Sequence, residues 1–391
     1  MQDILLTLCD QIQQAILLED GATLSRVLSR EDSATCQLII NNSQNFDSNL
    51  SQFRILLPKG WFEIFEAHCR SIITSQLDQQ FFYQSKVLKE FSDKIYNDSL
   101  PWVLPVMAVL TNDFRRLALH LYGIGGINEQ QLKNSYTSVL QPIFTQTMNC
   151  RDGKRDGALF VVNNMLRILK KLNSHVLLET IIKKMEHAKM LERIKLTHGK
   201  AHLVTFHFFL GYLKFFEGNY RVALESLKYA FENCPARFSK NKRLILLYLI
   251  PIKLLQNIRP SSTLLKKYNL LIFEELSRSV SRGNVGRFEN VLRSHENFFV
   301  KRGLYVVLER LKLRVYRNLF KRMHEFLEGV NKIPIEKFQI ALRVAKLAID
   351  KDECECIVAN LIYQKMLKGY ISHSQATVVF SKQEPFPLLL T

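Results

Sequence analysis

The sequence predicts an all-α protein that carries a small β-hairpin near its C-terminal end. Its 391 residues include 15 glycines and 10 prolines, which are few helix-breaking residues for this length. Hydrophobic residues make up 47% of the chain, enough to bury a sizeable core. Apolar side chains recur every three or four positions through most of the chain, the period of an amphipathic helix. The alternation typical of strands is confined to the stretch after residue 329.

The N-terminal half has the pattern of successive helices joined by short turns. Residues 12–28 indicate a helix pair that turns near Asp20. Amphipathic spacing predicts further helices at residues 160–172 and 176–194. We therefore expect residues 1–205 to form an N-terminal helical solenoid.

A repeat-like unit in the middle of the chain follows the tetratricopeptide spacing. Its characteristic positions are Leu210, Gly211, Gly218, Asn219, Tyr220, Ala223, Ala230, Phe231 and Pro235. Small residues let two antiparallel helices approach, Gly-Asn makes the turn, and proline ends the second helix. A second Gly-Asn turn, at Gly283, follows 65 residues after the first, close to two repeats of roughly 34 residues. With helices expected at 242–256 and 264–281, this spacing predicts a tetratricopeptide-like helical solenoid across residues 206–328.

The pattern changes after residue 329 to that of a winged helix. Its expected elements are an extended piece at 330–334, helices at 335–349 and 352–367, and the two strands of a wing at 369–372 and 377–380. Asp352 and Glu355 have the spacing of a capping box at the start of the second helix. We expect residues 329–391 to form a C-terminal winged-helix module that carries a small β-hairpin.

Searches for catalytic and metal-binding motifs fail. His202 and His207 do not have the spacing of a zinc protease, and Cys354 and Cys356 point to different helix faces and lack two further ligands. The sequence has neither a phosphate loop nor a nucleophile elbow. We therefore expect no enzymatic activity, no metal and no cofactor.

The sequence also predicts a soluble protein inside the cell. No stretch approaches the roughly 20 apolar residues that span a bilayer, and the first residues lack the basic start and apolar region of a signal peptide. The seven cysteines are odd in number and scattered, which indicates reduced thiols rather than a disulfide framework.

Positive charge is concentrated in the C-terminal part of the chain. Of the net charge of +18, residues 236–391 contribute +15, with 28 Lys/Arg against 13 Asp/Glu, whereas residues 1–110 carry −5. This asymmetry predicts that the C-terminal part meets a polyanion, either nucleic acid or an acidic protein.

A cationic ridge is predicted on a long helix at residues 301–327. Apolar residues at spacings of three and four form its core stripe, at Leu304, Leu308, Leu311, Val315, Leu319, Met323 and Phe326. Nearly opposite stand the four cations of the ridge, Arg310, Arg314, Arg317 and Lys321, with Lys312 and Arg322 beside them. Like charges at this spacing repel one another, so we expect the ridge to bind RNA. The alternative is a solvated face that Glu309 and Glu325 partly neutralise.

Sequence-specific DNA reading by the winged helix is disfavoured. Its second helix begins with Asp352, Glu353 and Glu355, which repel phosphates. The remaining cations are Lys365, Lys368 and Lys382, so RNA contact there would follow the backbone with weak sequence specificity. Tyr370 and Phe380 either stack on bases or are buried against the helices.

Two further cationic groups indicate a protein partner. Lys240, Lys242 and Arg243 crowd the start of an apolar helix, where the helix dipole disfavours cations. Lys266 and Lys267 form a second group. Carboxylates of an acidic partner, or phosphates, would offset both groups, and an internal carboxylate such as that of Glu232 is the alternative.

Six segments of the C-terminal half carry a family resemblance: KNKRLILLYLIPIK at 240–253, LLKKY at 264–268, YRNLFK at 316–321, ANLIY at 359–363, KGYISH at 368–373 and SKQEPFP at 381–387. With these segments the chain resembles the PCI family, in which a helical solenoid is fused to a winged helix. The match covers roughly residues 200–391, and within the family it is most similar to the Thp-type subunits of the nuclear transcription-and-export complex.

This resemblance implies a non-catalytic scaffold or adaptor subunit of an mRNA export complex at the nuclear pore. It implies three partners: a large PCI-containing export scaffold of the germinal-centre-associated nuclear protein type, a small acidic DSS/Sem-type protein, and RNA. The location it implies is nuclear, including the nuclear pore, with a cytoplasmic pool left open. The alternative is a PCI assembly subunit like those of the proteasome lid or signalosome, without RNA binding.

Overall fold

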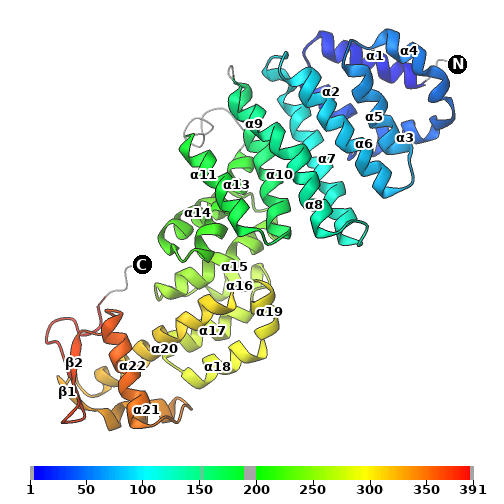
Figure 1. Ribbon diagram of the computed structural model, residues 1–391. Helices are drawn as coiled ribbons and strands as arrows, with labels where there is room; N and C mark the ends of the chain where they lie inside the picture. Colours follow the sequence, from blue (N-terminus) through cyan, green and yellow to red (C-terminus); the bar gives the residue numbers. More distant parts are fainter. Residues whose placement is uncertain (1–3, 151–152, 189–199, 388–391) are drawn as a thin grey trace. The chain divides into compact units, whose positions relative to one another are not determined.

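A computed structural model describes residues 4–150, 153–188 and 200–387, and it confirms the all-α class (Figure 1). The chain divides into two compact units, Met1–Phe206 and His207–Thr391, with the boundary inside α13 (Lys200–Phe216). Within the described residues, no helix is both long and apolar enough to cross a membrane.

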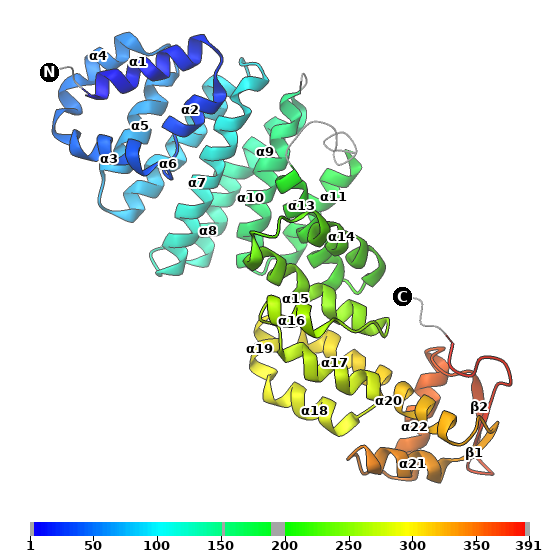
Figure 2. The ribbon, with the colours of Figure 1, turned by 180° about the vertical axis from the view of Figure 1, so that it is seen from behind.

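Unit 1 is built of helices that pack side by side, as the chain passes from blue to green in Figure 2. Its α-helices are α1 (Ile4–Leu17), α2 (Gly21–Val27), α3 (Ser33–Asn41), α4 (Leu50–Leu56), α5 (Trp61–Ile73), α6 (Leu77–Phe91), α7 (Leu104–Gly123), α8 (Glu129–Ser135), α9 (Gln141–Asn149), α10 (Gly157–Lys171) and α11 (His175–His187). Short turns of other helix types are η1 (Ser43–Asn45), η2 (Asp47–Asn49), η3 (Ser92–Tyr96), η4 (Pro101–Val103), η5 (Tyr136–Leu140) and η6 (Lys154–Asp156). The predicted end of the helix after residue 188 lies outside the described residues.

The predicted turn near Asp20 is confirmed, and its chemistry explains it. The Asp20 carboxylate accepts hydrogen bonds of 3.0 Å from the backbone N–H groups of Ala22 and Thr23, which caps α2. The next position must be a glycine, because α2 lies against Trp102. A Cβ on Gly21 would be 1.8 Å from the Trp102 carbonyl oxygen.

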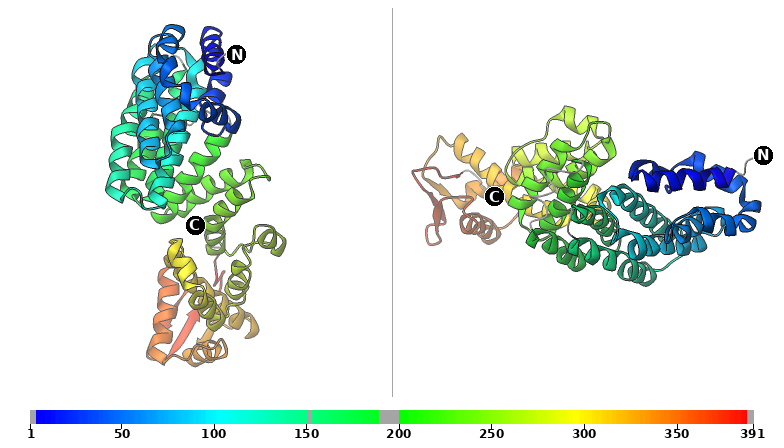
Figure 3. Two further views of the ribbon diagram at one scale, coloured as in Figure 1. Left: turned by 90° about the vertical axis from the view of Figure 1, so that its right-hand side faces the viewer. Right: turned by 90° about the horizontal axis from the view of Figure 1, so that it is seen from above.

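Helices α7 and α10 run parallel to one another in the centre of unit 1 (Figures 2 and 3). The first turn of α10 meets the first turn of α7, where a Cβ at Gly157 would lie 2.9 Å from a methyl of Leu104. At the far end, the ammonium of Lys171 lies 5.8 Å from the centre of the Tyr122 ring. Such parallel neighbours, separated in sequence by returning helices, are the arrangement of a helical solenoid.

Unit 2 holds the remaining helices and the described strands. Its helices are the second part of α13, α14 (Tyr220–Asn233), α15 (Ser239–Leu255), α16 (Ser262–Lys267), α17 (Ile272–Arg282), α18 (Val285–Ser294), α19 (Glu296–Lys301), α20 (Tyr305–Phe326), α21 (Ile335–Val344) and α22 (Lys351–Tyr363). Its strands are β1 (Lys332–Pro334), β2 (Gly369–Ser372) and β3 (Thr377–Phe380). The helix predicted at 264–281 is in fact two helices, α16 and α17, because the chain turns at Asn269 with a positive φ of 51°.

Both predicted Gly-Asn turns are confirmed. Gly218 and Gly283 adopt φ values of +78° and +71°, which glycine tolerates without steric cost. The asparagine after each glycine caps the next helix: Asn219 accepts from the Val222 N–H at 3.3 Å, and Asn284 accepts from the Arg287 N–H at 3.0 Å.

The predicted winged helix is confirmed, with two corrections. The sheet has three strands in the order β1-β3-β2, because the extended piece before α21 pairs antiparallel with β3 rather than standing alone. The cap of α22 is Asp350, whose carboxylate accepts from the Glu353 N–H at 2.7 Å, and not Asp352. The spacing of Asp352 and Glu355 therefore misplaced the helix start by two residues.

Candidate nucleic-acid and partner interface

Helix α20 packs against other elements on two faces, and this overturns the prediction of a single exposed ridge. It packs on α15, α17 and α18 of the helical part, and it also contacts α21 and α22 of the winged helix. Arg314 and Arg317 were expected to face solvent, but their residues are only 8% and 5% exposed. Conversely Phe326, expected in the core stripe, is 85% exposed.

Arg317 is a buried anchor for the winged helix. Its guanidinium donates to the backbone carbonyls of Met366 at 3.3 Å, Phe386 at 3.2 Å and Pro387 at 2.8 Å, and to the side-chain oxygen of Asn318 at 3.2 Å. Burial lowers the pKa of this guanidinium. The arginine thus ties the segments on both sides of the wing to α20 and is not available to a phosphate.

Arg314 is buried beside Arg317, but some of its hydrogen-bond donors have no acceptor within the part of the chain that the structure describes. Its Nε and Nη1 atoms are enclosed and have no hydrogen-bond partner among the described residues. Burial, together with the neighbouring Arg317 charge, lowers the pKa of Arg314 to about 10. We therefore remove both arginines from the predicted RNA-binding surface.

Three other cations predicted on α20 are exposed, but each has an internal contact, and the half-buried Lys312 pairs with Glu289 at 2.5 Å. Arg310 donates to the Tyr220 hydroxyl at 3.2 Å, and Arg322 donates to the carbonyl of Arg282 at 3.1 Å. Lys321 lies 3.7 Å from the Glu325 carboxylate, the pairing that the solvated-face alternative anticipated.

The wing cations, Lys365, Lys368 and Lys382, lie at one end of the winged helix, here called the wing end. The backbone N–H of Ser381 donates to the carbonyl of Lys368 at 2.9 Å, which places Lys382 beside Lys368 on the neighbouring chain segment. The Lys368 ammonium pairs with Glu384 at 3.0 Å. Lys365 and Lys382 are exposed, and no described carboxylate pairs with either.

The two wing aromatics have different environments. Phe380 is 3% exposed and packs on the rings of Phe338, His324 and Phe386, so it cannot stack on a base. Tyr370 is 61% exposed on β2. Tyr363, the last residue of the ANLIY segment and not predicted as a site residue, is 82% exposed at the end of α22, shortly before Lys365.

The lysines predicted to bind a protein partner meet on one pair of aromatic rings. The Lys242 ammonium lies 4.4 Å from the centre of the Phe231 ring and donates to the Phe231 carbonyl at 3.0 Å. Phe231 packs edge-on against Tyr268, and the Lys267 ammonium lies 5.7 Å from the Tyr268 ring centre. The start of α15 and the end of α16 therefore share one surface, here called the lysine–aromatic cluster. Its members are Lys240, Lys242, Arg243, Lys266, Lys267, Phe231 and Tyr268.

The remaining members of that cluster are exposed. They are Lys240, Arg243 and Lys266, for which the described residues offer no ion pair. Glu232, the internal carboxylate considered as their counterion, instead lies 3.9 Å from Lys228. Phe238, 45% exposed at the N-cap of α15, adds an apolar side chain to this surface.

The part of the chain that the structure describes contains no cluster of metal-binding side chains. No group of three or more His, Cys, Asp or Glu side chains there is placed to hold a metal ion. Cys354 is buried whereas Cys356 is exposed, and all seven cysteines have free thiols.

The helical part of unit 2 and its terminal winged helix together define a PCI-domain scaffold protein, and the PCI domain model matches residues 292–382. Over the whole chain, similarity extends to PCI domain-containing protein 2 of Xenopus laevis, which is 33% identical with 97% of each chain covered. A PCI domain-containing protein 2 homolog of Dictyostelium discoideum is 36% identical, covering 90% of this chain and 84% of that protein. Protein CSN12 homolog of Schizosaccharomyces pombe is 28% identical, covering 85% and 84%. The chain belongs to the PCI domain-containing protein 2 family.

Proposed function

We propose that the protein is a non-catalytic adaptor subunit of a nuclear mRNA export complex at the nuclear pore. In this role it binds a PCI-type scaffold, a small acidic DSS/Sem-type protein, and RNA. The observation that carries the proposal is that two separate exposed cationic surfaces, the wing end and the lysine–aromatic cluster, retain cations without described carboxylate partners. Family membership and the resemblance to Thp-type subunits support the same role.

The RNA contact that we propose is smaller than the ridge predicted from the sequence. Its cations are Arg310, Lys321, Arg322, Lys365, Lys368 and Lys382, all exposed. Tyr363 and Tyr370 are exposed aromatic rings near the wing cations and supply stacking surfaces for unpaired bases. The acidic first turn of α22 keeps this contact away from a groove-inserting pose.

Reversing Lys365 and Lys382 to Glu together should weaken RNA binding by about 10-fold or more and lower the salt slope by roughly 1.5, because two phosphate contacts are lost. Fluorescence anisotropy with unrelated single-stranded RNAs, over a series of salt concentrations, measures both quantities. The control is the Arg293→Glu/Lys301→Glu variant, which removes the same charge from exposed positions on α18 and α19. If both variants weaken binding equally, the wing end is only part of a diffuse positive field.

The lysine–aromatic cluster is proposed to bind the small acidic protein. Partner carboxylates would pair with Lys240 and Arg243 while an apolar side chain packs near Phe238. Charge complementarity of this kind sets partner choice and association rate more than raw affinity.

Adding a DSS/Sem-type protein should raise the melting temperature of the wild-type chain, since a ligand at 100 times its Kd stabilises the folded state by about 2.7 kcal/mol. Lys240→Glu/Arg243→Glu should abolish most of that rise without lowering the melting temperature of the free protein, because both side chains are exposed and form no ion pair with a described residue. Differential scanning fluorimetry with titrated partner tests this. An equal rise in the variant would remove the cluster from the interface.

The competing function is that of an assembly subunit in a proteasome-lid or signalosome-like complex without RNA binding. The similarity to a protein named CSN12 homolog is the observation that favours this competing function. In that case every exposed cation meets acidic protein, and the wild-type chain would not bind RNA in the anisotropy measurement.

A further inference from the structure

A second arginine site lies in unit 1, between the parallel helices α7 and α10. The guanidinium of Arg115 on α7 is held by two neutral amide oxygens: its Nε donates to Asn164 on α10 at 2.9 Å, and its Nη2 donates to Asn112 at 2.6 Å. Asn164 is itself fixed, because its amide donates to the Thr111 hydroxyl at 3.2 Å and to the Phe160 carbonyl at 3.1 Å. Arg115 is therefore oriented by bonds that do not neutralise its charge.

Arg167 lies beside Arg115. It follows Asn164 by three residues on α10, so both side chains lie on the same face of that helix, toward α7. The half-buried Arg167 has no hydrogen bond or ion pair within the described residues, and burial lowers the pKa of its guanidinium. Burial lowers the pKa of Arg115 to about 10, and the neighbouring Arg167 charge contributes to this shift.

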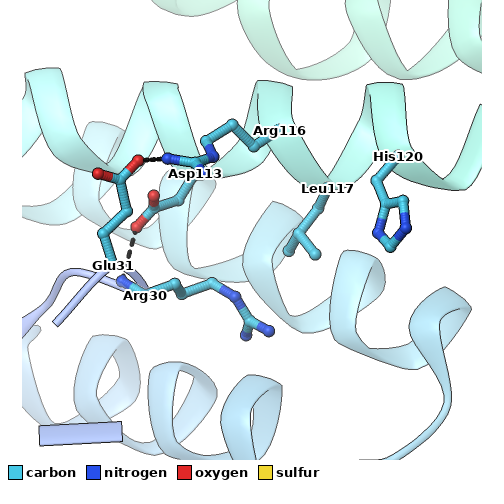
Figure 4. Close-up of a pocket in the computed structure, with 6 residues that line it drawn as sticks. All are labelled: Arg30, Glu31, Asp113, Arg116, Leu117 and His120. Carbon is cyan, nitrogen blue, oxygen red and sulfur yellow. Dashed lines mark hydrogen bonds and ion pairs between the residues drawn. The ribbon is translucent and has the colours of Figure 1, made fainter. Parts of the chain in front are cut away.

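Carboxylates near this pair are already engaged on another face of α7. Figure 4 shows Asp113, Arg116 and His120 lining a pocket with Arg30 and Glu31. The Asp113 carboxylate accepts from the Arg30 backbone N–H at 2.9 Å, and Glu31 forms an ion pair with Arg116. Together α7 and α10 carry five Lys/Arg residues against the single carboxylate of Asp113.

The surface around the pair favours a phosphate over a protein. None of the large hydrophobic residues of α7 or α10 is exposed. Protein interfaces are centred on buried apolar or aromatic anchors, which this surface does not supply. Two neighbouring arginines instead favour a phosphate, whose oxygens arginine binds through paired, charge-assisted hydrogen bonds. Lys171, one turn beyond Arg167, adds an exposed cation for a neighbouring phosphate.

We propose that Arg115 and Arg167 bind backbone phosphates of RNA, forming a second RNA contact in unit 1 that is independent of the winged helix. Asn112 and Asn164 are positioning residues, because they orient the Arg115 guanidinium. This inference rests on the RNA-binding part of the proposed function and extends it to unit 1, in which no site residue was predicted from the sequence.

The test uses the full chain and a fluorescently labelled single-stranded oligouridylate. Arg167→Gln should weaken binding about 3- to 10-fold and lower the salt slope by about 0.7, as expected for the loss of one phosphate contact on a single strand. Arg167→Lys should lie between this variant and the wild type, because it keeps the charge but loses the paired donors. The control Lys133→Gln removes an exposed cation from α8 and should change affinity less than twofold.

Folding does not confound this comparison. The Arg167 side chain has no internal hydrogen bond within the described residues, so Arg167→Gln should keep the wild-type melting temperature. If Arg167→Gln binds RNA as tightly as Lys133→Gln while Lys365→Glu/Lys382→Glu loses binding, this inference is overturned and the proposed function stands. If the wild-type chain itself does not bind RNA, both are overturned.

Discussion

Replacing Arg317 with Met should lower the free energy of unfolding by about 3 kcal/mol or more, although methionine fits the space and removes a charge. Three backbone carbonyls, those of Met366, Phe386 and Pro387, would lose their donor in a buried place. A buried acceptor without a partner costs roughly 1–3 kcal/mol, and hydrogen bonds from a charged donor lie at the upper end of that range. Urea denaturation followed by circular dichroism measures the change.

The matched control for this experiment is Arg310→Met on the same helix. Arg310 is exposed and makes one described hydrogen bond, to the Tyr220 hydroxyl, so its loss should change stability by about 0.5 kcal/mol at most. Equal stability of the two variants would contradict the anchoring role. By the same argument, Arg314→Glu/Arg317→Glu should unfold the winged helix, whereas an exposed ridge would have tolerated it.

Gly283→Ala should destabilise unit 2 far more than Gly218→Ala, although both glycines occupy the same place in a Gly-Asn turn. Both have positive φ, so each alanine carries backbone strain of order 1 kcal/mol. At Gly283 a Cβ would also lie 2.4 Å from the backbone nitrogen of Leu319 and 2.5 Å from its Cα, and backbone atoms of α20 cannot give way cheaply. At Gly218 the nearest atom is the end of the Arg310 side chain at 3.7 Å.

We expect Gly283→Ala to lower the free energy of unfolding by about 3 kcal/mol or more, because overpacking adds to backbone strain. Gly218→Ala should lower it by about 1 kcal/mol. Thermal unfolding of the two variants beside the wild type separates these effects. Similar losses would mean that α20 shifts away from α17, and a crystal structure of Gly283→Ala would then show a displaced Leu319.

Local signals allowed much of the fold to be predicted from the sequence. Glycine followed by asparagine has few conformational alternatives, so the turns at Gly218 and Gly283 were identified correctly. Alternation over four residues likewise placed β2 and β3 at their observed positions. The pairing of β1 was missed because a three-residue strand has no period of its own and is defined by its partner, β3.

The candidate site was less predictable because it depends on what packs against α20. A single apolar stripe was assumed, yet Tyr316 and Phe320 lie off that stripe and are buried, at 6% and 0% exposure. These two aromatic residues were the available sign that a second face is covered. The meeting of Lys242 and Lys267 across Phe231 and Tyr268 had no local sign, because it depends on how α14, α15 and α16 pack.

The strand order of the wing has a consequence for how the chain completes its fold during synthesis. β3 is the central strand, so β1 and β2 have no strand partner until Thr377–Phe380 is available. β1 must therefore wait for more than forty intervening residues, a long-range contact that forms slowly compared with the local helices around it. A ribosome that stopped just before Thr377 would release a chain with two unpaired strands, and such edges promote pairing with other chains. The acceptors that Arg317 binds at Phe386 and Pro387 emerge later still, so the nascent winged helix is both unpaired and unanchored until nearly all of this sequence has been translated.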